Sequence, residues 1–228
     1  MIKKTDLSGL YNGSLFNSMK DSFIIKEKDP CAKICQVKFV AKGADFILST
    51  EDLFSSSENL YTKKSEDFHF RRKCDGFVIC EYNGQGYLIW IEIKSSFNEV
   101  FSDAIYQISG CYIKAKSYLN SIISFSEEEY KEFGIVVSLP DSGVNELSNP
   151  SLLKRKRSVI LGNDTVEDIY RRQYRQTHKI TLKGDDFGMS NIALSPSIQL
   201  SKLPIVHISE TLGSSVQDLT CIIKSVFP

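Results

Sequence analysis

The sequence predicts an α/β protein with a mixed central sheet flanked by helices. Residues 74–94 read as a β-hairpin, because two runs rich in β-branched and aromatic residues flank a turn rich in Asn and Gly. Residues 97–121 repeat apolar side chains at helical spacing, and residues 133–139 form a short apolar run that Pro140 closes. Residues 88–93 are largely apolar on both faces, so we expect this strand at the centre of the sheet, covered on both sides.

The hairpin turn sets which residues oppose each other across the strands. Asn83 and Gly84 are the residues that a two-residue turn prefers. With that turn, the expected opposed pairs are Asp75–Glu92, Phe77–Trp90 and Ile79–Leu88. A four-residue loop over residues 83–86 would shift the pairing by two and keep the same faces. A three-residue loop or a bulge would break this geometry.

Asp75, Glu92 and Lys94 are expected on one patch of the sheet, because Lys94 follows Glu92 by two residues. Directly opposed like charges destabilise a sheet, and partly buried carboxylates are costly unless they are paired or bind metal. A divalent cation between the carboxylates would relieve both penalties. Hard oxygen ligands favour Mg²⁺, Mn²⁺ or Ca²⁺ over zinc. The alternative is a structural salt-bridge cluster on a half-exposed sheet.

An Asp before one strand and Glu-x-Lys at the end of the next resembles the signature of the PD-(D/E)xK nuclease superfamily. The signature reads here Cys74-Asp75-Gly76 and Ile91-Glu92-Ile93-Lys94-Ser95, with Cys74 in the place of Pro, and the resemblance covers residues 44–140. It implies a restriction-endonuclease-like αβββαβ core with extra C-terminal strands. It also implies that Asp75, Glu92 and the backbone carbonyl of Ile93 hold one or two Mg²⁺ or Mn²⁺ ions. Lys94 would then orient the attacking water or stabilise charge on the transition state.

The helix after the hairpin resembles the RecB-like branch of this superfamily in part. That branch carries a Gln with a Tyr four residues later, near the metal site. Here Gln107 matches the Gln, Cys111 occupies the Tyr position and Tyr112 comes next. Gln107 is therefore expected to position Lys94 or a phosphate; equally, it is a polar residue at the border of an amphipathic helix. The superfamily often adds an acid from its first helix, and the candidates are Glu27, Glu51 and Glu58.

At 228 residues the chain is expected to form one compact domain. Residues 1–43 form an N-terminal extension packed on the core, residues 44–140 the nuclease core, and residues 141–228 a C-terminal extension with a basic segment. We expect a helix over residues 14–25, a strand or hairpin over 35–48 and a short helix over 50–60. Further strands are expected over residues 159–161, 180–182 and 205–208.

The charge is unevenly distributed although its sum is zero. Residues 151–183 contain nine Lys or Arg and three acids, a net charge of +6. Such a surface suits phosphate contacts, and cations on the strand that enters the site would steer a polyanion toward it. The expected nucleic-acid-binding residues are His69, Arg71, Lys73, Lys154, Arg155, Lys156, Arg157, Arg171, Arg172 and Arg175. Alternatively, these cations complement a helix dipole or neutralise local acids.

Several function classes have no support in the sequence. No Gly-rich phosphate loop or Ser-centred nucleophile elbow occurs, and His178 and His207 accompany no obvious nucleophile, so both are interpreted as structural. Neither a leader peptide nor a membrane span is visible, so we expect a cytoplasmic protein with no membrane partner. The six cysteines form no zinc or iron–sulfur pattern and are expected to be reduced.

The first hypothesis is a metal-dependent nuclease that hydrolyses phosphodiester bonds, with DNA favoured and endonucleolytic cutting expected. By analogy alone, such a nuclease serves bacterial defence or restriction, gated by an activating partner protein or by homo-oligomerisation. The second hypothesis is a catalytically inactive module of the nuclease fold that binds nucleic acid or a partner protein. A third is a structural subunit whose exposed strands assemble with another chain.

Overall fold

The computed structural model describes residues 1–27, 29–49, 52–55, 73–95, 97–139, 172–173, 180–184, 194–209 and 216–228. These residues build an eight-stranded sheet in the order β1-β2-β3-β4-β5-β7-β6, with β8 paired to β2. The strands are β1 (Phe16–Lys26), β2 (Gln36–Ser49), β3 (Gly76–Tyr82), β4 (Gln85–Lys94), β5 (Tyr130–Ser138), β6 (Ile180–Lys183), β7 (Lys202–Ser209) and β8 (Val216–Asp218). The described helices are α1 (Lys4–Leu10), α2 (Asp52–Ser55), α3 (Phe97–Leu119) and α6 (Leu219–Val226), with 3₁₀ turns η1 (Gly13–Leu15) and η3 (Glu127–Glu129).

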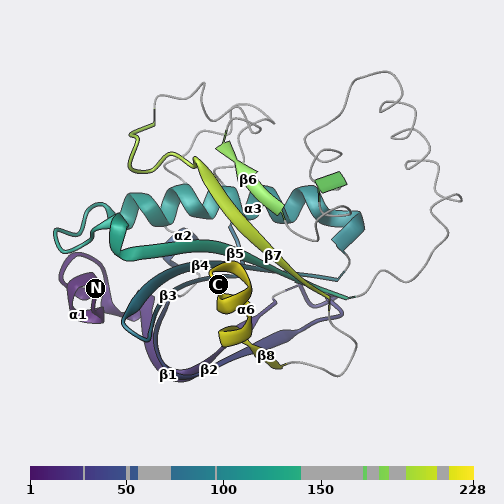
Figure 1. Ribbon diagram of the computed structural model, residues 1–228, viewed down its shortest axis with the longest axis horizontal. Helices are drawn as coiled ribbons and strands as arrows, with labels where there is room; N and C mark the ends of the chain where they lie inside the picture. Colours follow the sequence, from purple (N-terminus) through teal and green to yellow (C-terminus); the bar gives the residue numbers. More distant parts are fainter. Residues whose placement is uncertain are drawn as a thin grey trace, which may run out of the picture.

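The sheet is mixed, as the sequence predicts. Strands β1 to β4 are joined antiparallel, β4, β5 and β7 run parallel, and β6 returns antiparallel to β7. Parallel neighbours need a crossover connection, and α3 supplies it between β4 and β5 (Figure 1). Because α3 begins directly after β4, the start of this helix lies near the carboxyl ends of the parallel strands.

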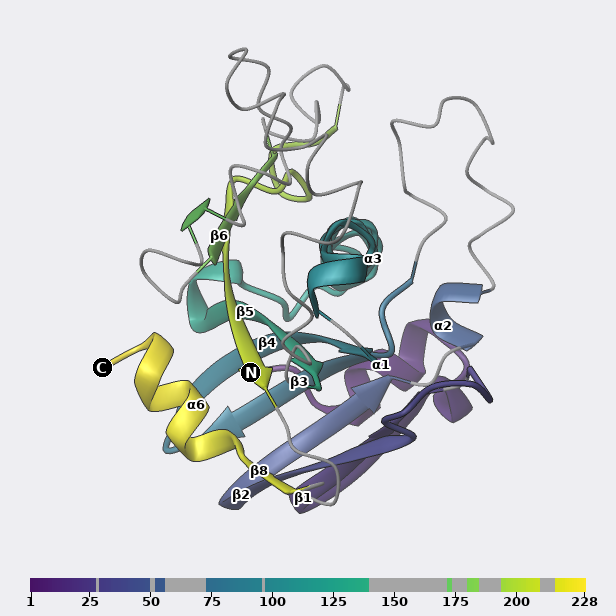
Figure 2. The same cartoon turned by 90° about the vertical axis from the view of Figure 1, so that its right-hand side faces the viewer.

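Helices cover the central strands on both faces. Helix α3 lies along one face of the sheet and α6 lies against the other, which both views show (Figures 1 and 2). Leu88 and Trp90 of β4 pack in the cluster that contains the buried side of α3. Ile89, Ile91 and Ile93 pack on the opposite side with Leu219 and neighbouring residues of α6. The prediction that β4 is central and covered on both sides is confirmed.

The N-terminal prediction of a helix over residues 14–25 is wrong. Phe16 to Lys26 form β1, which pairs along almost its whole length with β2. Phe16, Met19 and Phe23 recur at a spacing that also suits a helix, so the apolar pattern alone does not decide between the two structures. The pairing with β2 makes this segment a strand. The register of the β1–β2 pair shifts between Lys20 and Ser22.

The other expected elements fall close to their predicted positions where the structure describes them. The strand expected over residues 35–48 is β2, the one over 133–139 is β5, and those over 180–182 and 205–208 are β6 and β7. Helix α3 ends at Leu119 rather than near residue 121, and helix is described over Asp52–Ser55 within the range 50–60. The strand expected over residues 159–161 lies outside the described residues. Among the described helices, none has the length and apolar character to cross a membrane.

Candidate active site at the end of the β3–β4 hairpin

The hairpin has the turn that its sequence predicts. Asn83 and Gly84 adopt positive φ angles of 51° and 75°, as a two-residue turn with a matching twist requires. The resulting register places Phe77 opposite Trp90 and Ile79 opposite Leu88. The pair of Gly76 with Ile91 ends the ladder, so Asp75, which directly precedes β3, lies beside the end of β4.

The carboxylates of Asp75 and Glu92 lie together at this end of the hairpin. The backbone N–H of Asp75 donates to Oε2 of Glu92 at 3.2 Å. In return, the backbone N–H of Ile93 donates to Oδ2 of Asp75 at 2.7 Å. Each acid is therefore held by the backbone of the strand that carries the other acid. The two side chains therefore lie at the same end of the hairpin, close enough to interact.

Glu92 is a buried acid that forms an ion pair with Lys94. Its side chain is 0% exposed, and Lys94 Nζ lies 2.5 Å from its Oε1. Burial raises the pKa of Glu92 well above its usual value, and the negative charge of Asp75 raises it further; the ammonium of Lys94 opposes both effects without overcoming them. The ionised form of Glu92 is therefore destabilised in this structure even with Lys94 beside it.

Lys94 is held in its charged form by the acids around it. Burial would lower the pKa of the Lys94 amine, but Glu92, Asp75 and Glu27 raise it above its usual value. The side chain is 18% exposed, so one side of the ammonium reaches the surface.

Helix α3 positions the segment that leads into Asp75. Gln107 Nε2 donates to the backbone carbonyl of Lys73 at 3.1 Å. One helical turn later, the Sγ of Cys111 accepts from the backbone N–H of Cys74 at 2.7 Å. Both thiols are buried, and burial followed by the contact with Cys111 raises the pKa of Cys74. Gln107 thus contacts the backbone before Asp75; its expected role in placing Lys94 or a phosphate stays a prediction.

Of the three candidates for a further acid, Glu27 lies within electrostatic reach of the cluster. It follows directly after β1, its Oε1 accepts from the backbone N–H of Asp29 at 3.0 Å, and its charge contributes to the raised pKa of Lys94. Ser95 Oγ accepts from the backbone N–H of Lys33 at 3.1 Å, so the β1–β2 connection touches the end of β4. Glu51 and Glu58 lie outside the described residues.

The expected nucleic-acid-binding residues are largely outside the described part of the chain. Lys73 is half-buried beside Asp75, and Arg172 is exposed. The others, which are not described, are His69, Arg71, Lys154, Arg155, Lys156, Arg157, Arg171 and Arg175. A basic surface over residues 154–175 therefore stays a prediction.

Sequence reasoning missed a polar pair on the strands next to β4. Ser138 Oγ and His207 Nε2 lie 2.8 Å apart, and Ser138 is 0% exposed. Ser138 of β5 pairs with Lys94. His207 of β7 pairs with Val136, the residue that pairs with Glu92. The sequence showed no obvious partner for His207, because the parallel register that brings it beside Ser138 is not visible there; its interpretation as a structural residue stays a prediction.

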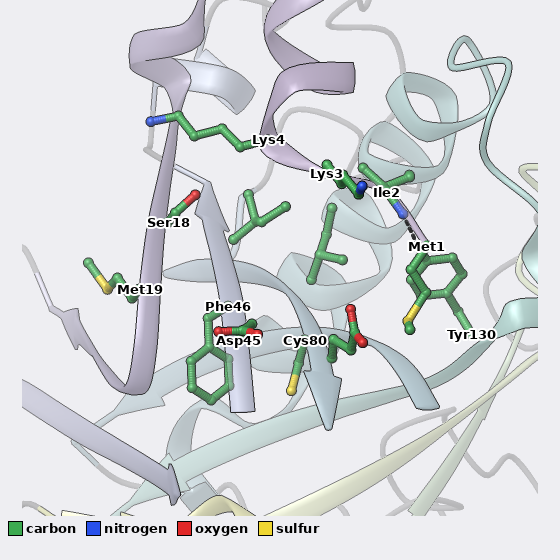
Figure 3. Close-up of a pocket in the computed structure, with 13 residues that line it drawn as sticks. Met1, Ile2, Lys3, Lys4, Ser18, Met19, Asp45, Phe46, Cys80 and Tyr130 are labelled. Atoms are coloured by element: carbon green, nitrogen blue, oxygen red, sulfur yellow. Dashed lines mark hydrogen bonds between the residues drawn. The ribbon is translucent and has the colours of Figure 1, made fainter. Parts of the chain in front are cut away.

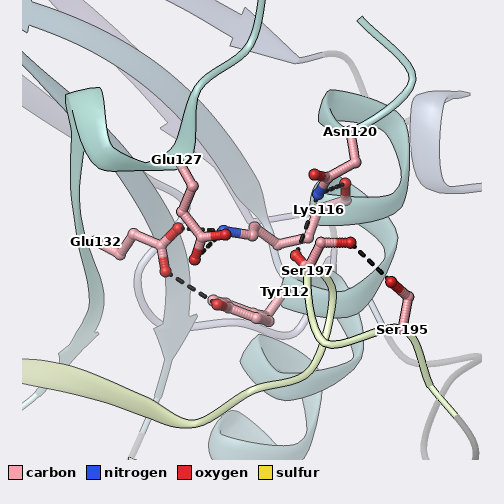
Figure 4. A network of polar contacts seen from close by, with 7 residues as sticks. All are labelled: Tyr112, Lys116, Asn120, Glu127, Glu132, Ser195 and Ser197. Atoms are coloured by element: carbon pink, nitrogen blue, oxygen red, sulfur yellow. Dashed lines mark hydrogen bonds and ion pairs between the residues drawn. The ribbon is translucent and has the colours of Figure 1, made fainter.

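A second buried charge cluster lies at the opposite end of the same strands (Figure 4). Lys116 is 0% exposed, and its Nζ lies 2.8 Å from Glu127 Oε1 and 2.7 Å from Glu132 Oε1. Tyr112 donates its hydroxyl to Glu132 Oε2 at 3.0 Å. Asn120 Nδ2 donates to the carbonyl of Ser197 at 3.1 Å, which ties the end of α3 to residues 194–200. We call these residues the Lys116 network; its contacts join secondary-structure elements to one another.

A pocket of about 290 Å³ lies between α1, β1, β2 and β3, away from the hairpin end (Figure 3). Lys3, Lys4, Asp45 and Glu81 line it together with apolar residues, and Tyr130 closes one side, accepting from the backbone N–H of Ile2. Its charges are mixed, and it shares no lining residue with the Asp75–Glu92–Lys94 cluster.

The chain matches no protein-family model, no curated protein and no solved structure.

Within the described ranges, no set of three or more His, Cys, Asp and Glu side chains is placed to share an ion. Among those residues the cluster offers two acidic side chains, and the backbone of β4 is a further source of oxygen ligands. In a strand the N–H and C=O of one residue point toward the same neighbour. Because the N–H of Ile93 points to Asp75, the carbonyl of Ile93 faces the same side of β4.

Proposed function

We propose that this protein is a metal-dependent nuclease of the PD-(D/E)xK type that hydrolyses phosphodiester bonds. The observation that carries the proposal is the proximity of Asp75 and Glu92. The carboxylate of Glu92 accepts from the backbone N–H of Asp75, the carboxylate of Asp75 accepts from the backbone N–H of Ile93, and Lys94 forms an ion pair with Glu92. An acid pair with one amine at a strand end is the chemistry that this reaction needs. The restriction-endonuclease-like core belongs to the same proposal, with β3, β4, α3 and β5 as its central elements.

The residues present fit a divalent cation such as Mg²⁺ or Mn²⁺. Asp75, Glu92 and the carbonyl of Ile93 supply the hard oxygen ligands that these ions prefer, and both ions accept water at their other positions. The raised pKa of Glu92 is an independent sign, because burial and Asp75 disfavour its charge while Lys94 alone fails to compensate. A cation held here would relieve that penalty.

The chemistry divides among the residues of the cluster. When bound, the cation supplies a Lewis acid that polarises the scissile phosphate and makes an attacking water more acidic. Asp75 and Glu92 hold the ion at the hairpin end, and the backbone bonds to their carboxylates fix both side chains in advance. Lys94 presents its ammonium to the phosphate and stabilises the negative charge that grows on its oxygens. Gln107 keeps the backbone before Asp75 in place.

The decisive experiment is a cleavage panel with a matched control. Purified protein is incubated with closed circular plasmid, linear duplex, single strands and RNA, each with Mg²⁺ or Mn²⁺. We expect cleavage by the wild type, and a fall of about 100-fold or more in Glu92→Ala and Lys94→Ala, the scale of losing a transition-state charge contact. Glu81→Ala removes an exposed acid from the same hairpin and should leave the rate unchanged. If the wild type cuts none of these substrates with either ion, the proposal is overturned.

The proposal favours DNA as the substrate and endonucleolytic cutting. A basic segment over residues 154–175 would suit a nucleic acid that extends beyond the cluster. Cleavage of the closed circle tests the second point directly. A role in bacterial defence or restriction, an activating partner protein or homo-oligomer and a cytoplasmic location remain part of the same proposal by analogy.

The alternative is an inactive nuclease-fold module that binds nucleic acid or a partner protein. Calorimetry with Mg²⁺ and Mn²⁺ separates it from the enzyme. If the wild type binds the ion and Asp75→Ala does not, the result supports the enzyme hypothesis. If the wild type binds no ion at millimolar concentration, the result favours the inactive module.

A further inference from the structure

The β1–β2 hairpin curves below β3 and β4 (Figure 1), and Ile25 near its far end belongs to the same buried cluster as Ile91 and Ile93. A Cβ added to Gly76 would collide with Cδ1 of Ile25, so β1 approaches the start of β3 closely at this point. Because Gly76 directly follows Asp75, β1 ends beside the candidate active site.

The loop between β1 and β2 contacts the segment that follows Lys94. The backbone N–H of Lys33 donates to Oγ of Ser95 at 3.1 Å, and Ser95 is the next residue after Lys94. At the other end of the loop, the charge of Glu27 contributes to the raised pKa of Lys94. The loop therefore forms one border of the candidate site, and the side chains that it exposes lie next to any substrate bound there.

The outer face of the far half of this hairpin carries lysines and no acid among its described residues. Ile24 pairs with Lys38 and Lys26 pairs with Gln36, and all four side chains are exposed. Lys26 and Lys38 are therefore diagonal neighbours, roughly 7–8 Å apart. Lys33 is exposed on the adjoining loop. Within the described part of the chain, Lys26, Lys33 and Lys38 form no ion pair.

The acids of the same hairpin are held by backbone N–H groups instead. Asp21 Oδ1 accepts from Gly43 at 2.6 Å, Glu27 Oε1 accepts from Asp29 at 3.0 Å, and Asp29 Oδ1 accepts from Cys31 at 2.8 Å. These contacts fix turns of the hairpin. Residues 20–42 contain six Lys and three acids, a net charge of +3. The excess positive charge is therefore displayed on the outer face and on the loop.

We propose that Lys26, Lys33 and Lys38 bind the phosphate backbone of the nucleic acid on one side of the cut. The inference rests on the proposed nuclease function, which supplies the ligand, and it adds a surface outside the residues that the sequence indicated. Exposed ammonium groups without carboxylate partners suit phosphates, which attract them irrespective of base sequence. Because the loop contacts Ser95, Lys33 lies nearest the scissile phosphate, and Lys26 and Lys38 continue the path away from it.

The test measures the salt dependence of binding by fluorescence anisotropy. A labelled DNA duplex, a DNA single strand and an RNA are titrated separately, with EDTA in place of the divalent ion so that nothing is cut. The triple variant Lys26→Gln, Lys33→Gln, Lys38→Gln should bind more weakly than the wild type, with a larger loss at about 50 mM salt than at about 200 mM. Each phosphate contact adds about 0.7–0.9 to the slope of log affinity against log salt, so the slope should fall by about 2–3.

A second triple variant, Lys3→Gln, Lys202→Gln, Lys224→Gln, is the matched control. It removes the same number of charges from exposed lysines of α6, of β7 and of the residue before α1, and it should keep the wild-type slope. Equal slopes in the wild type and in the triple variant of the hairpin would overturn this inference, and cleavage of plasmid by the wild type would still support the nuclease proposal.

The two proposals can also fail in the other order. If the wild type cuts no substrate but the hairpin variant lowers the slope, the nuclease proposal fails and the lysine surface is still a nucleic-acid-binding surface. If the wild type binds none of the three nucleic acids at low salt, this inference is overturned whatever the cleavage panel shows.

Discussion

Two buried charge clusters lie on the same face of the β4–β5 pair, and they are built differently. The Lys116 network lies where Leu88 pairs with Glu132, and the Asp75–Glu92–Lys94 cluster lies where Glu92 pairs with Val136. Four residues along β4 separate these levels, roughly 13 Å. Helix α3 serves both, with Tyr112 and Lys116 in its C-terminal half and Gln107 near its middle.

The Lys116 network satisfies its members from within the protein. The fully buried ammonium lies between Glu127 and Glu132, and Tyr112 gives Glu132 a second donor. Glu127 is 51% exposed, so solvent also screens part of the negative charge. These contacts join α3 to η3 and β5, so a role in holding the elements together accounts for the network.

The charge of Glu92 in the hairpin-end cluster is less fully compensated. Burial and the charge of Asp75 raise the pKa of Glu92, and the ammonium of Lys94 only partly opposes them. A cluster that serves stability alone would be expected to compensate its buried charge, because breaking or under-compensating such a charge costs several kcal/mol. The proposed metal site would account for this difference, because a bound cation would compensate the charge of Glu92. Four experiments test this difference, beginning with the largest expected effect.

Lys116→Met should destabilise the protein by about 3–5 kcal/mol, because it leaves Glu132 partly buried without its cation. Denaturant unfolding measures the loss. Lys224→Met, at an exposed lysine of α6, is the control and should change stability by less than about 0.5 kcal/mol. A loss below about 1 kcal/mol for Lys116→Met would show that the network is not structural.

Metal should stabilise the wild type through the hairpin-end cluster and not through the Lys116 network. At an ion concentration about ten times the dissociation constant, binding adds about 1.4 kcal/mol to the free energy of unfolding. Thermal unfolding with and without Mg²⁺ should show this shift in the wild type and lose it in Asp75→Asn. Tyr112→Phe should keep it. An equal shift in Asp75→Asn and the wild type would place the ion elsewhere.

Glu92→Gln should stabilise the metal-free protein near pH 8, by an amount of the order of 1 kcal/mol, because it removes a buried acid whose charge Lys94 compensates only in part. The pKa of Glu92 is raised in the folded state above its ordinary value of 4.5. Stability linked to this group is therefore fully present below pH 4.5 and lost as the pH rises through the raised pKa. The gain in Glu92→Gln should vanish toward pH 4.5, which unfolding curves at several pH values would show. Destabilisation at pH 8 would instead identify a structural ion pair.

Tyr112→Phe should cost about 1 kcal/mol, the typical contribution of one hydrogen bond, since it removes the donor to Glu132 Oε2. Denaturant unfolding measures this loss, and phosphodiester hydrolysis should be unchanged. If the rate of hydrolysis fell by more than the loss of folded protein explains, the two clusters would be coupled, which contradicts their separation.

The hairpin is the part of this site that could be read from the sequence. Asn83 and Gly84 select the turn, and the period of two along each strand then assigns every residue to a face. For this reason the proximity of Asp75 and Glu92 could be predicted from local signals alone. Gln107 was placed on the correct helix, but its partner, the carbonyl of Lys73, follows from how α3 packs on the hairpin.

Other features had no local signal. Residues 14–25 carry apolar spacing that suits a helix, and their strand conformation comes from pairing with β2. His207 lies 69 residues after Ser138, and the two meet because β5 and β7 are parallel neighbours. The Lys116 network likewise joins α3 to the start of β5 through side chains whose positions depend on the crossover.

The sequence by itself determined the hairpin, its register and the grouping of two acids and a lysine on one face, because turn preference and strand periodicity act between residues close in the chain. Only the tertiary structure decided which strands became neighbours, which charges were buried and which found partners. Those outcomes depend on packing between segments far apart in sequence. Many pairings of strands satisfy the same local pattern, and the burial of apolar side chains over the whole sheet selects one of them.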